Sequence, residues 1–190
     1  MKIILASKSP RRKELLSEIV SEFEIVTAEC DEALPSDIHP RQGVEMLAVR
    51  KGEAVLNRLC GCELVISSDT LVELDGKPLG KPKNDEDACD MLRQLSGRGH
   101  NVHTGVAVHY RGKVFSGVDS TAVYFKPLSD EEIESYILSG ESKDKAGSYG
   151  IQGLGGRFVE RYEGRFDTVV GLSVKLTEEL INKAVNDEKK

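Results

Sequence analysis

The 190-residue sequence lacks several features that mark large classes of protein. No apolar run approaches the roughly 20 residues that a membrane-spanning helix needs, so we expect no membrane partner. The opening apolar run, residues 3–6, is too short for the core of a signal peptide, which favours a cytoplasmic location. The phosphate-loop motif GxxxxGKS/T does not occur either, so this is not a P-loop protein.

The chain has fewer positively than negatively charged residues. The chain has 26 lysines and arginines against 32 aspartates and glutamates, a formal net charge of −6. Because binding a nucleic-acid backbone needs a broad basic surface, we expect no nucleic-acid partner, and any phosphate site must be local. The 39% hydrophobic and 31% charged residues are typical of a water-soluble globular chain, which predicts one domain over residues 1–190.

The few cysteines do not form a zinc pattern. Cys30, Cys60, Cys62 and Cys89 include no CxxC pair, and the four histidines do not complete a metal site. We interpret the cysteines as free thiols in a reducing compartment. The close pair Cys60 and Cys62 could contact a soft metal, but a free cysteine is more often a small core residue, and we favour that alternative.

The apolar pattern predicts an α/β fold with a mixed, twisted sheet flanked by helices. Expected strands are residues 3–6, 64–66, 71–74, 102–110, 114–125, 158–159 and 169–170. Expected helices begin at Ser9-Pro10, cover residues 41–59 and 84–95, run from the capping box at Ser129 to Gly140, and begin again after Thr177. A short turn at residues 111–113 suits an antiparallel hairpin, so the sheet should be mixed.

Cations stand where an anion would be favoured. Arg11 and Arg12 fall in the first turn of the first predicted helix, whose unpaired N–H groups attract negative charge. Ser7 and the backbone around it add polar groups at the end of a strand, so a phosphate cradle is preferred over two solvated arginines. Lys51 continues the apolar stripe of its helix and faces inward, although a snorkelling side chain is the favoured alternative without further support.

A carboxylate follows the next strand-like run. Asp69 comes after the apolar residues 64–66, and ligands of open α/β sheets bind where strands end. A turn aspartate is an equally good interpretation on this segment alone. Glu32 and Lys81 add a further carboxylate and a cation on proline-restricted backbone, so acids, bases and a metal could meet here.

Two further segments are less specific. The glycine-rich loop, residues 147–156, would let backbone approach a ligand, but it lacks the GxGxxG spacing of a dinucleotide fold. His100 and His103 are three residues apart in a predicted strand, so they should point to opposite faces and are poor candidates for one metal site.

Together these segments resemble the Maf family of nucleotide pyrophosphatases, related in fold to the inosine triphosphate pyrophosphatases. The resemblance runs along nearly the whole chain, through residues 7–12, 31–32, 51, 68–70, 80–82, 95–97, 100, 144–153 and 170–172. It implies an elongated two-lobed fold around a cleft, commonly a homodimer, that cuts a nucleoside triphosphate to the monophosphate and pyrophosphate.

The resemblance also implies roles for individual residues. Asp69 would accept the proton of the attacking water, and Glu32 would join it in positioning a divalent cation, Mg²⁺ or alternatively Mn²⁺ or Co²⁺. Substrate would be bound by Ser7, Arg11, Arg12, Lys51, Thr70, Lys81 and Gln152. Phosphoryl transfer depends mainly on positioning and charge stabilisation, which agrees with this set.

Three of these residues point to one branch of the family. Arg11, Thr70 and Gln152 resemble the branch that acts on dTTP and UTP, with CTP or modified pyrimidine nucleotides as further substrates to test. The other branch prefers 7-methyl-GTP and usually has glutamate where Gln152 stands. Two rivals remain open: a pyrophosphatase for another modified nucleotide, and a nucleotide-binding division-arrest regulator without turnover. The chain departs from the common family pattern at Gly52, where alanine is usual, and at Ser173, where proline is frequent.

Overall fold

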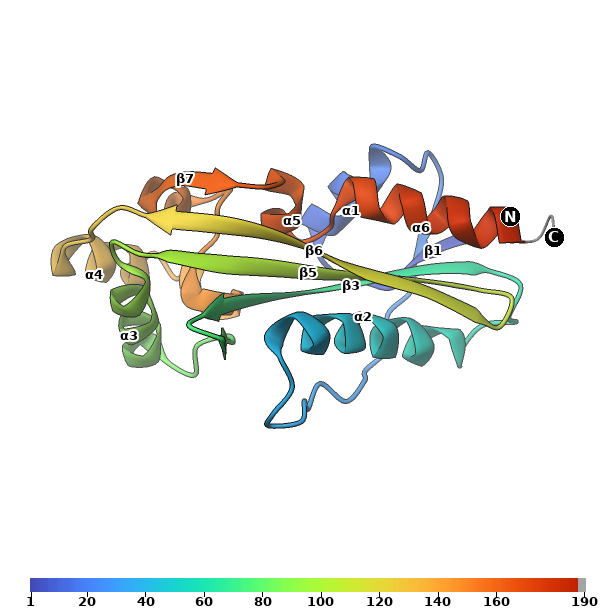
Figure 1. Ribbon diagram of the computed structural model, residues 1–190, viewed down its shortest axis with the longest axis horizontal. Helices are drawn as coiled ribbons and strands as arrows, with labels where there is room; N and C mark the ends of the chain where they lie inside the picture. The colour runs from blue at the N-terminus through green and yellow to red at the C-terminus, as the bar shows by residue number, and fades with distance from the viewer. Residues whose placement is uncertain (188–190) are drawn as a thin grey trace.

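The computed structural model describes residues 1–187 as an elongated α/β protein built along one long sheet (Figure 1). The strands are β1 (Ile3–Leu5), β2 (Glu24–Ile25), β3 (Leu64–Leu74), β4 (Lys77–Leu79), β5 (Gly99–Tyr110), β6 (Lys113–Phe125) and β7 (Val159–Glu163). The α-helices are α1 (Pro10–Ser17), α2 (Pro40–Leu56), α3 (Asp85–Leu95), α4 (Asp130–Leu138), α5 (Phe166–Val170) and α6 (Val174–Asn186). Short 3₁₀ turns are η1 (Glu141–Asp144), η2 (Ala146–Ser148) and η3 (Leu154–Phe158).

The sheet is mixed, as predicted. Over the described residues it has seven strands in the order β2-β1-β3-β5-β6-β7, with β4 paired to β3. The pairs of β1 with β2 and β3 are parallel, whereas β3–β5, β5–β6 and β6–β7 are antiparallel. In Figure 1, α2 covers one side of the sheet, α6 lies across the other side, and α3 and α4 gather at one end. No helix in residues 1–187 is both long and apolar enough to cross a membrane.

The long strand β3 replaces two shorter predicted strands. Asp69 therefore lies in the middle of a strand, opposite Gly105 of β5, and not at a strand end. The expectation failed because the serines before Asp69 do not break the strand. Their hydroxyls are buried and hydrogen-bonded, Ser67 to the carbonyl of Ala48 and Ser68 to that of Gly171.

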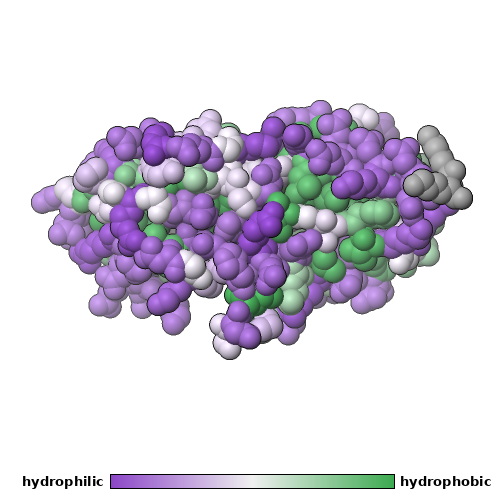
Figure 2. Space-filling view, viewed as in Figure 1, coloured by the Kyte–Doolittle hydropathy of each residue, from purple (hydrophilic) through white to green (hydrophobic). Residues whose placement is uncertain are grey.

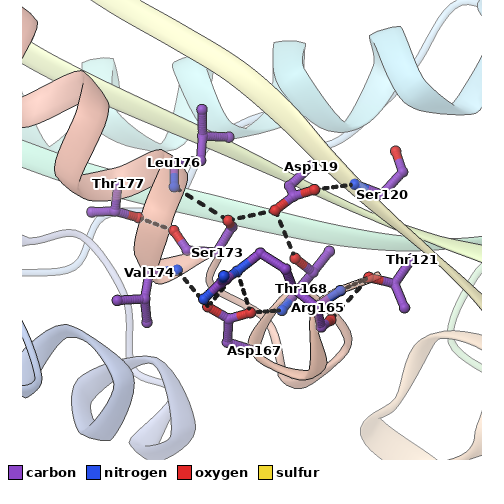
Figure 3. Close-up of polar contacts among 10 residues, drawn as sticks. All are labelled: Asp119, Ser120, Thr121, Arg165, Asp167, Thr168, Ser173, Val174, Leu176 and Thr177. Carbon is purple, nitrogen blue, oxygen red and sulfur yellow. Dashed lines mark hydrogen bonds and ion pairs between the residues drawn. The ribbon is translucent and has the colours of Figure 1, made fainter. Parts of the chain in front are cut away.

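The C-terminal region also differs from expectation. Residues 169–170 belong to α5 and not to a strand, and α6 begins at Val174, before Thr177. Figure 3 shows why: the buried carboxylate of Asp167 accepts hydrogen bonds from the backbone N–H groups of Thr168 and Val174 and from Arg165. Ser173 caps α6 and donates to Asp119 at 2.6 Å. Side-chain bonds between distant segments thus decide this turn.

Local signals at helix ends and turns are confirmed. Ser9 caps α1 with Pro10 in its first turn, and the capping box of Ser129 and Glu132 begins α4. The hairpin turn before β6 has positive φ at both Arg111 and Gly112, as such tight turns require.

The hydrophobic core is divided along the sheet. One cluster packs α3 and α4 against one end of the strands, around Tyr136 and Phe158. Another packs α1 and α6 against the opposite end, around Leu16 and Leu180, and a small third cluster lies between α2 and β1. This division agrees with the two lobes that the resemblance implies. Hydrophilic residues cover most of the face in Figure 2, while apolar ones gather over the sheet between α2 and α6.

The interpretation of the cysteines as core residues is wrong for the close pair. Cys60 and Cys62 are exposed, and Cys30 and Cys89 are half-buried. The reason is that residues 60–62 form a loop between α2 and β3, with Gly61 at a φ of 86°. All four are free thiols, as expected.

The departure at Gly52 has a packing reason. A Cβ atom on Gly52 would lie 2.2 Å from Nε2 of His109 and 2.8 Å from Oγ of Ser67. His109 on β5 is 1% exposed, and burial lowers the pKa of its imidazole. Glycine at position 52 therefore makes room for a buried histidine between α2 and the sheet.

Candidate active site

A pocket of about 770 Å³ opens near the middle of the sheet, between the two larger core clusters. It is lined by the start of α1, one residue each of α2 and β5, the centre of β3, the segment after β4, most of the segment 141–153 and the end of α5. The predicted site residues that line it are Arg11, Arg12, Lys51, Asp69, Thr70, Lys81 and Gln152. Residues from nearly the whole length of the chain, from Lys8 to Val170, thus meet here.

Arg12 is held in place by groups from two distant segments. Its Nε donates to the carbonyl of Gly171 at 2.9 Å, and an Nη donates to Oγ1 of Thr70 at 3.3 Å. Ser68 donates to the same Gly171 carbonyl, while Thr70 and Thr104 share a hydrogen bond of 3.0 Å. Burial lowers the pKa of the guanidinium, although Asp69 opposes this. The arrangement presents a pre-positioned cation to the pocket.

Lys51 joins two carboxylates. Its Nζ forms ion pairs with Oδ1 of Asp69 and, at 2.9 Å, with Oε1 of Glu32. Burial would by itself lower the pKa of the Lys51 ammonium, but Asp69 and Glu32 outweigh that effect and raise it. The Lys51 side chain is 21% exposed and points at carboxylates, so the snorkelling alternative is wrong.

Two predicted residues lie outside the pocket lining. Ser7 is buried, and its Oγ accepts a hydrogen bond from the backbone N–H of Ser9 at 3.2 Å, which shapes the turn before α1. Glu32 is exposed and reaches the site only through Lys51. The Lys51 hydrogen bond lowers the pKa of the Glu32 carboxyl, so this group is charged at neutral pH.

The pocket lining is mixed in character. It combines cations and carboxylates, among them Asp69 of β3, with apolar side chains. The apolar lining residues include Val72, Val102, Tyr149 and Val169. A ligand with a charged group and a flat, less polar group matches this arrangement.

The sequence patterns missed several lining residues. Lys145 bonds the carbonyl of Glu141 at 2.7 Å and the carboxylate of Asp144 at 2.8 Å, and all three face the pocket. Lys8 lines it as well. The signal available for Lys145 and Asp144 was their place beside the glycine-rich loop, which the resemblance included without assigning them roles.

The two strand histidines have separate surroundings, as predicted. His100 forms a hydrogen bond with the hydroxyl of Tyr149 at 2.8 Å, while His103 forms hydrogen bonds with Glu73 at 2.8 Å and Ser120 at 2.7 Å.

Within residues 1–187, no three His, Cys, Asp or Glu side chains are grouped so that they could hold a metal by themselves.

The fold and the cleft define an α/β protein whose central pocket suits a small anionic ligand. The fold is similar to that of the Staphylococcus aureus Ham1 protein, with a TM-score of 0.51 and 16% identity over 66% of this chain and 72% of that one. A crystal structure of a Vibrio cholerae protein matches 99% of this chain and 97% of its own, with a TM-score of 0.53 and 13% identity.

Sequence comparison then identifies the family. The Maf-like protein family matches residues 2–184, and this chain belongs to it. A dTTP/UTP pyrophosphatase of Vibrio cholerae is 48% identical over 96% of this chain and 97% of that protein. A protein of the same name from Alkaliphilus metalliredigens is 45% identical over 96% of this chain and 95% of that protein. Another from Carboxydothermus hydrogenoformans is 49% identical over 92% of this chain and 94% of that protein.

Proposed function

We propose that this chain is a nucleoside triphosphate pyrophosphatase that hydrolyses dTTP and UTP to the nucleoside monophosphate and pyrophosphate. The observation that carries the proposal is the pair of ion pairs that Lys51 forms with Asp69 in the pocket lining and with Glu32 beside it. The names of relatives up to 49% identical, matched over nearly their whole length, support the same reaction and substrates.

The chain's own groups account for binding and proton transfer. Arg12 and Lys81 hold the triphosphate, and an incoming phosphate gives the Lys51 ammonium a third anion that competes with Asp69 and Glu32. The freed Asp69 carboxylate accepts a proton from the attacking water. The water oxygen bonds to the α-phosphorus, the bond from that phosphorus to the bridging oxygen breaks, and pyrophosphate leaves with its charge stabilised by the cations.

A divalent cation fits the donor set. Glu32 and Asp69 converge on the same Lys51 ammonium, so two carboxylates face one point beside the pocket. Mg²⁺ is typically bound by one or two carboxylates together with substrate phosphates, which this pair allows; Mn²⁺ and Co²⁺ are alternatives. When bound, the cation supplies positive charge that polarises the phosphoryl group.

Base selection rests mainly on Gln152. The Thr70 hydroxyl contacts Arg12 and Thr104, so it acts first on the position of the arginine. Gln152 lines the pocket and offers both a donor and an acceptor, as the O4/N3 edge of uracil or thymine requires. A glutamate there could only accept, which suits the two donors on the edge of a 7-methylguanine.

The test compares kcat/KM for UTP, dTTP, CTP and 7-methyl-GTP in the wild type and in Gln152→Glu. We expect the wild type to prefer UTP and dTTP, and the variant to lose that preference. A wild type that prefers 7-methyl-GTP would refute the branch, and release of orthophosphate in place of pyrophosphate would refute the reaction. Binding of nucleotide without any turnover would instead support the regulator.

A further inference from the structure

Glu141 shortly precedes the glycine-rich loop in the chain and lies beside it. It is the first residue of η1, directly after Gly140, whose φ of 75° turns the chain sharply at the end of α4. This turn directs the Glu141 side chain toward residues 150–155. Glu141 is half-buried and lines the same pocket.

The Glu141 carboxylate uses both oxygens to hold the far side of the loop. Oε2 accepts a hydrogen bond from the backbone N–H of Leu154 at 2.8 Å, and Oε1 accepts one from Gly155 at 3.2 Å. The Tyr136 hydroxyl also donates to Oε1 at 3.1 Å. Since η3 has no capping bond from its own side chains, a carboxylate 13 positions earlier satisfies its first N–H groups.

One glycine of the loop is required by this contact. A Cβ on Gly153 would lie 2.4 Å from both Glu141 oxygens, whereas one on Gly150 would meet mainly the Lys145 side chain, 2.8 Å from its Cε. Both positions flank the segment that contains Gln152. Glycine at position 153 therefore lets the loop close onto the carboxylate directly after Gln152.

The carboxylate is charged at neutral pH despite its position. Burial would raise the pKa of Glu141, but the backbone donors, the Tyr136 hydroxyl and the nearby Lys145 ammonium together lower it. Hydrogen bonds to a charged acceptor are roughly twice as strong as those between neutral groups. The loop is thus anchored by charge-assisted hydrogen bonds from Leu154 and Gly155 to Glu141.

We propose that Glu141 is a positioning residue for base selection, which holds the glycine-rich loop so that Gln152 meets the nucleotide base. The inference rests on the proposed function, in which Gln152 forms hydrogen bonds with the nucleotide base. It assigns Glu141 no contact with the reacting atoms. A shift of about 1 Å in a positioning group can cost on the order of 100-fold in rate, so the loss should be readily measurable.

The experiment compares Glu141→Gln with a matched control, Glu132→Gln. Glu132 also accepts a backbone N–H bond, from Ser129 at 3.0 Å, but it caps α4 and does not line the pocket. For each protein we would measure kcat and KM for UTP and 7-methyl-GTP, inhibition by inorganic pyrophosphate, and thermal melting. Gly153→Ala perturbs the same contact from the loop side and serves as a second variant if Glu141→Gln folds poorly.

We expect Glu141→Gln and Gly153→Ala to lower the UTP to 7-methyl-GTP ratio of kcat/KM at least about tenfold, mainly through the KM for UTP. Inhibition by pyrophosphate should stay unchanged, and Glu132→Gln should keep the wild-type ratio. With Gln152→Ala present, Glu141→Gln should no longer alter the ratio.

Two results would overturn the inference while leaving the proposed function in place. One is a wild-type ratio in Glu141→Gln, and the other is an equal loss for both nucleotides and for pyrophosphate binding, as expected of a general structural role. A wild type that prefers 7-methyl-GTP would instead refute the proposed substrate and, with it, the role of Glu141.

Discussion

Replacing Gly52 by alanine should destabilise this chain. In most helices the change stabilises, because glycine is about 0.8–1.0 kcal/mol less favourable than alanine in a helix interior. Here the added Cβ would lie 2.2 Å from Nε2 and 2.3 Å from Cδ2 of His109. Optimal contacts between such atoms are about 3.5–4.0 Å, so the overlap exceeds 1 Å.

The size of the effect depends on whether the His109 ring or helix α2 can move away from the added Cβ. His109 is 1% exposed and Gly52 lies within α2 against the sheet, so neither the ring nor the helix can move into solvent. Overpacking of this kind costs about 1–3 kcal/mol, with this case at the upper end. After the helix-propensity gain, we expect a net loss of about 1–2 kcal/mol. In a chain of this size that lowers Tm by about 2–8 °C.

The assay is a double-mutant cycle by thermal and urea unfolding of the wild type, Gly52→Ala, His109→Ala and the double variant. With His109 removed, Gly52→Ala should reverse sign and stabilise by up to about 1 kcal/mol. UTP turnover should fall in Gly52→Ala, because a displaced α2 carries Lys51 away from Asp69. A stabilised single variant, or the same loss in both backgrounds, would refute this account of position 52.

Four further predictions concern the site and its supports. Asp69→Asn should lower turnover by about 10²–10⁴-fold while folding and nucleotide binding persist, as single-turnover assays and titrations can show; near-normal turnover would remove Asp69 from the mechanism. Arg12→Ala should reduce kcat/KM for UTP far more than it reduces Tm, and a proportional loss of both would assign it a structural role. Ser173→Ala removes the cap of α6 and a hydrogen bond to Asp119, so it should lower stability by about 1–2 kcal/mol, and an unchanged Tm would contradict this. Burial lowers the pKa of His100 to about 4, so between pH 6.5 and 4 the unfolded chain binds a proton that the folded chain does not. The free energy of unfolding should therefore fall by up to about 3 kcal/mol from pH 6.5 to 4. Urea unfolding of His100→Asn should show a smaller fall over this range than the wild type.

Local patterns along the chain predicted most of the secondary structure. Ser9-Pro10, the Ser129 capping box and the turn at Arg111-Gly112 each act within a few residues, so their outcome depends little on the rest of the fold. The motifs that resemble the Maf family also indicated the cations and the carboxylate that line the pocket. These features could be found because short-range hydrogen bonding and residue order are written directly in the sequence.

Other features depended on contacts between distant segments. The strand through Asp69 continues because Ser67 and Ser68 find buried partners on α2 and after α5, and no local pattern shows that. Thr70 accepts a hydrogen bond from Arg12, which is 58 positions away in the chain. Glu141 accepts one from Leu154 in the loop of Gln152, which is 13 positions away. The sequence by itself determined which groups are available and where helices begin. Only the tertiary structure decided which groups meet, because a buried polar atom takes whichever partner the packing brings within hydrogen-bond distance.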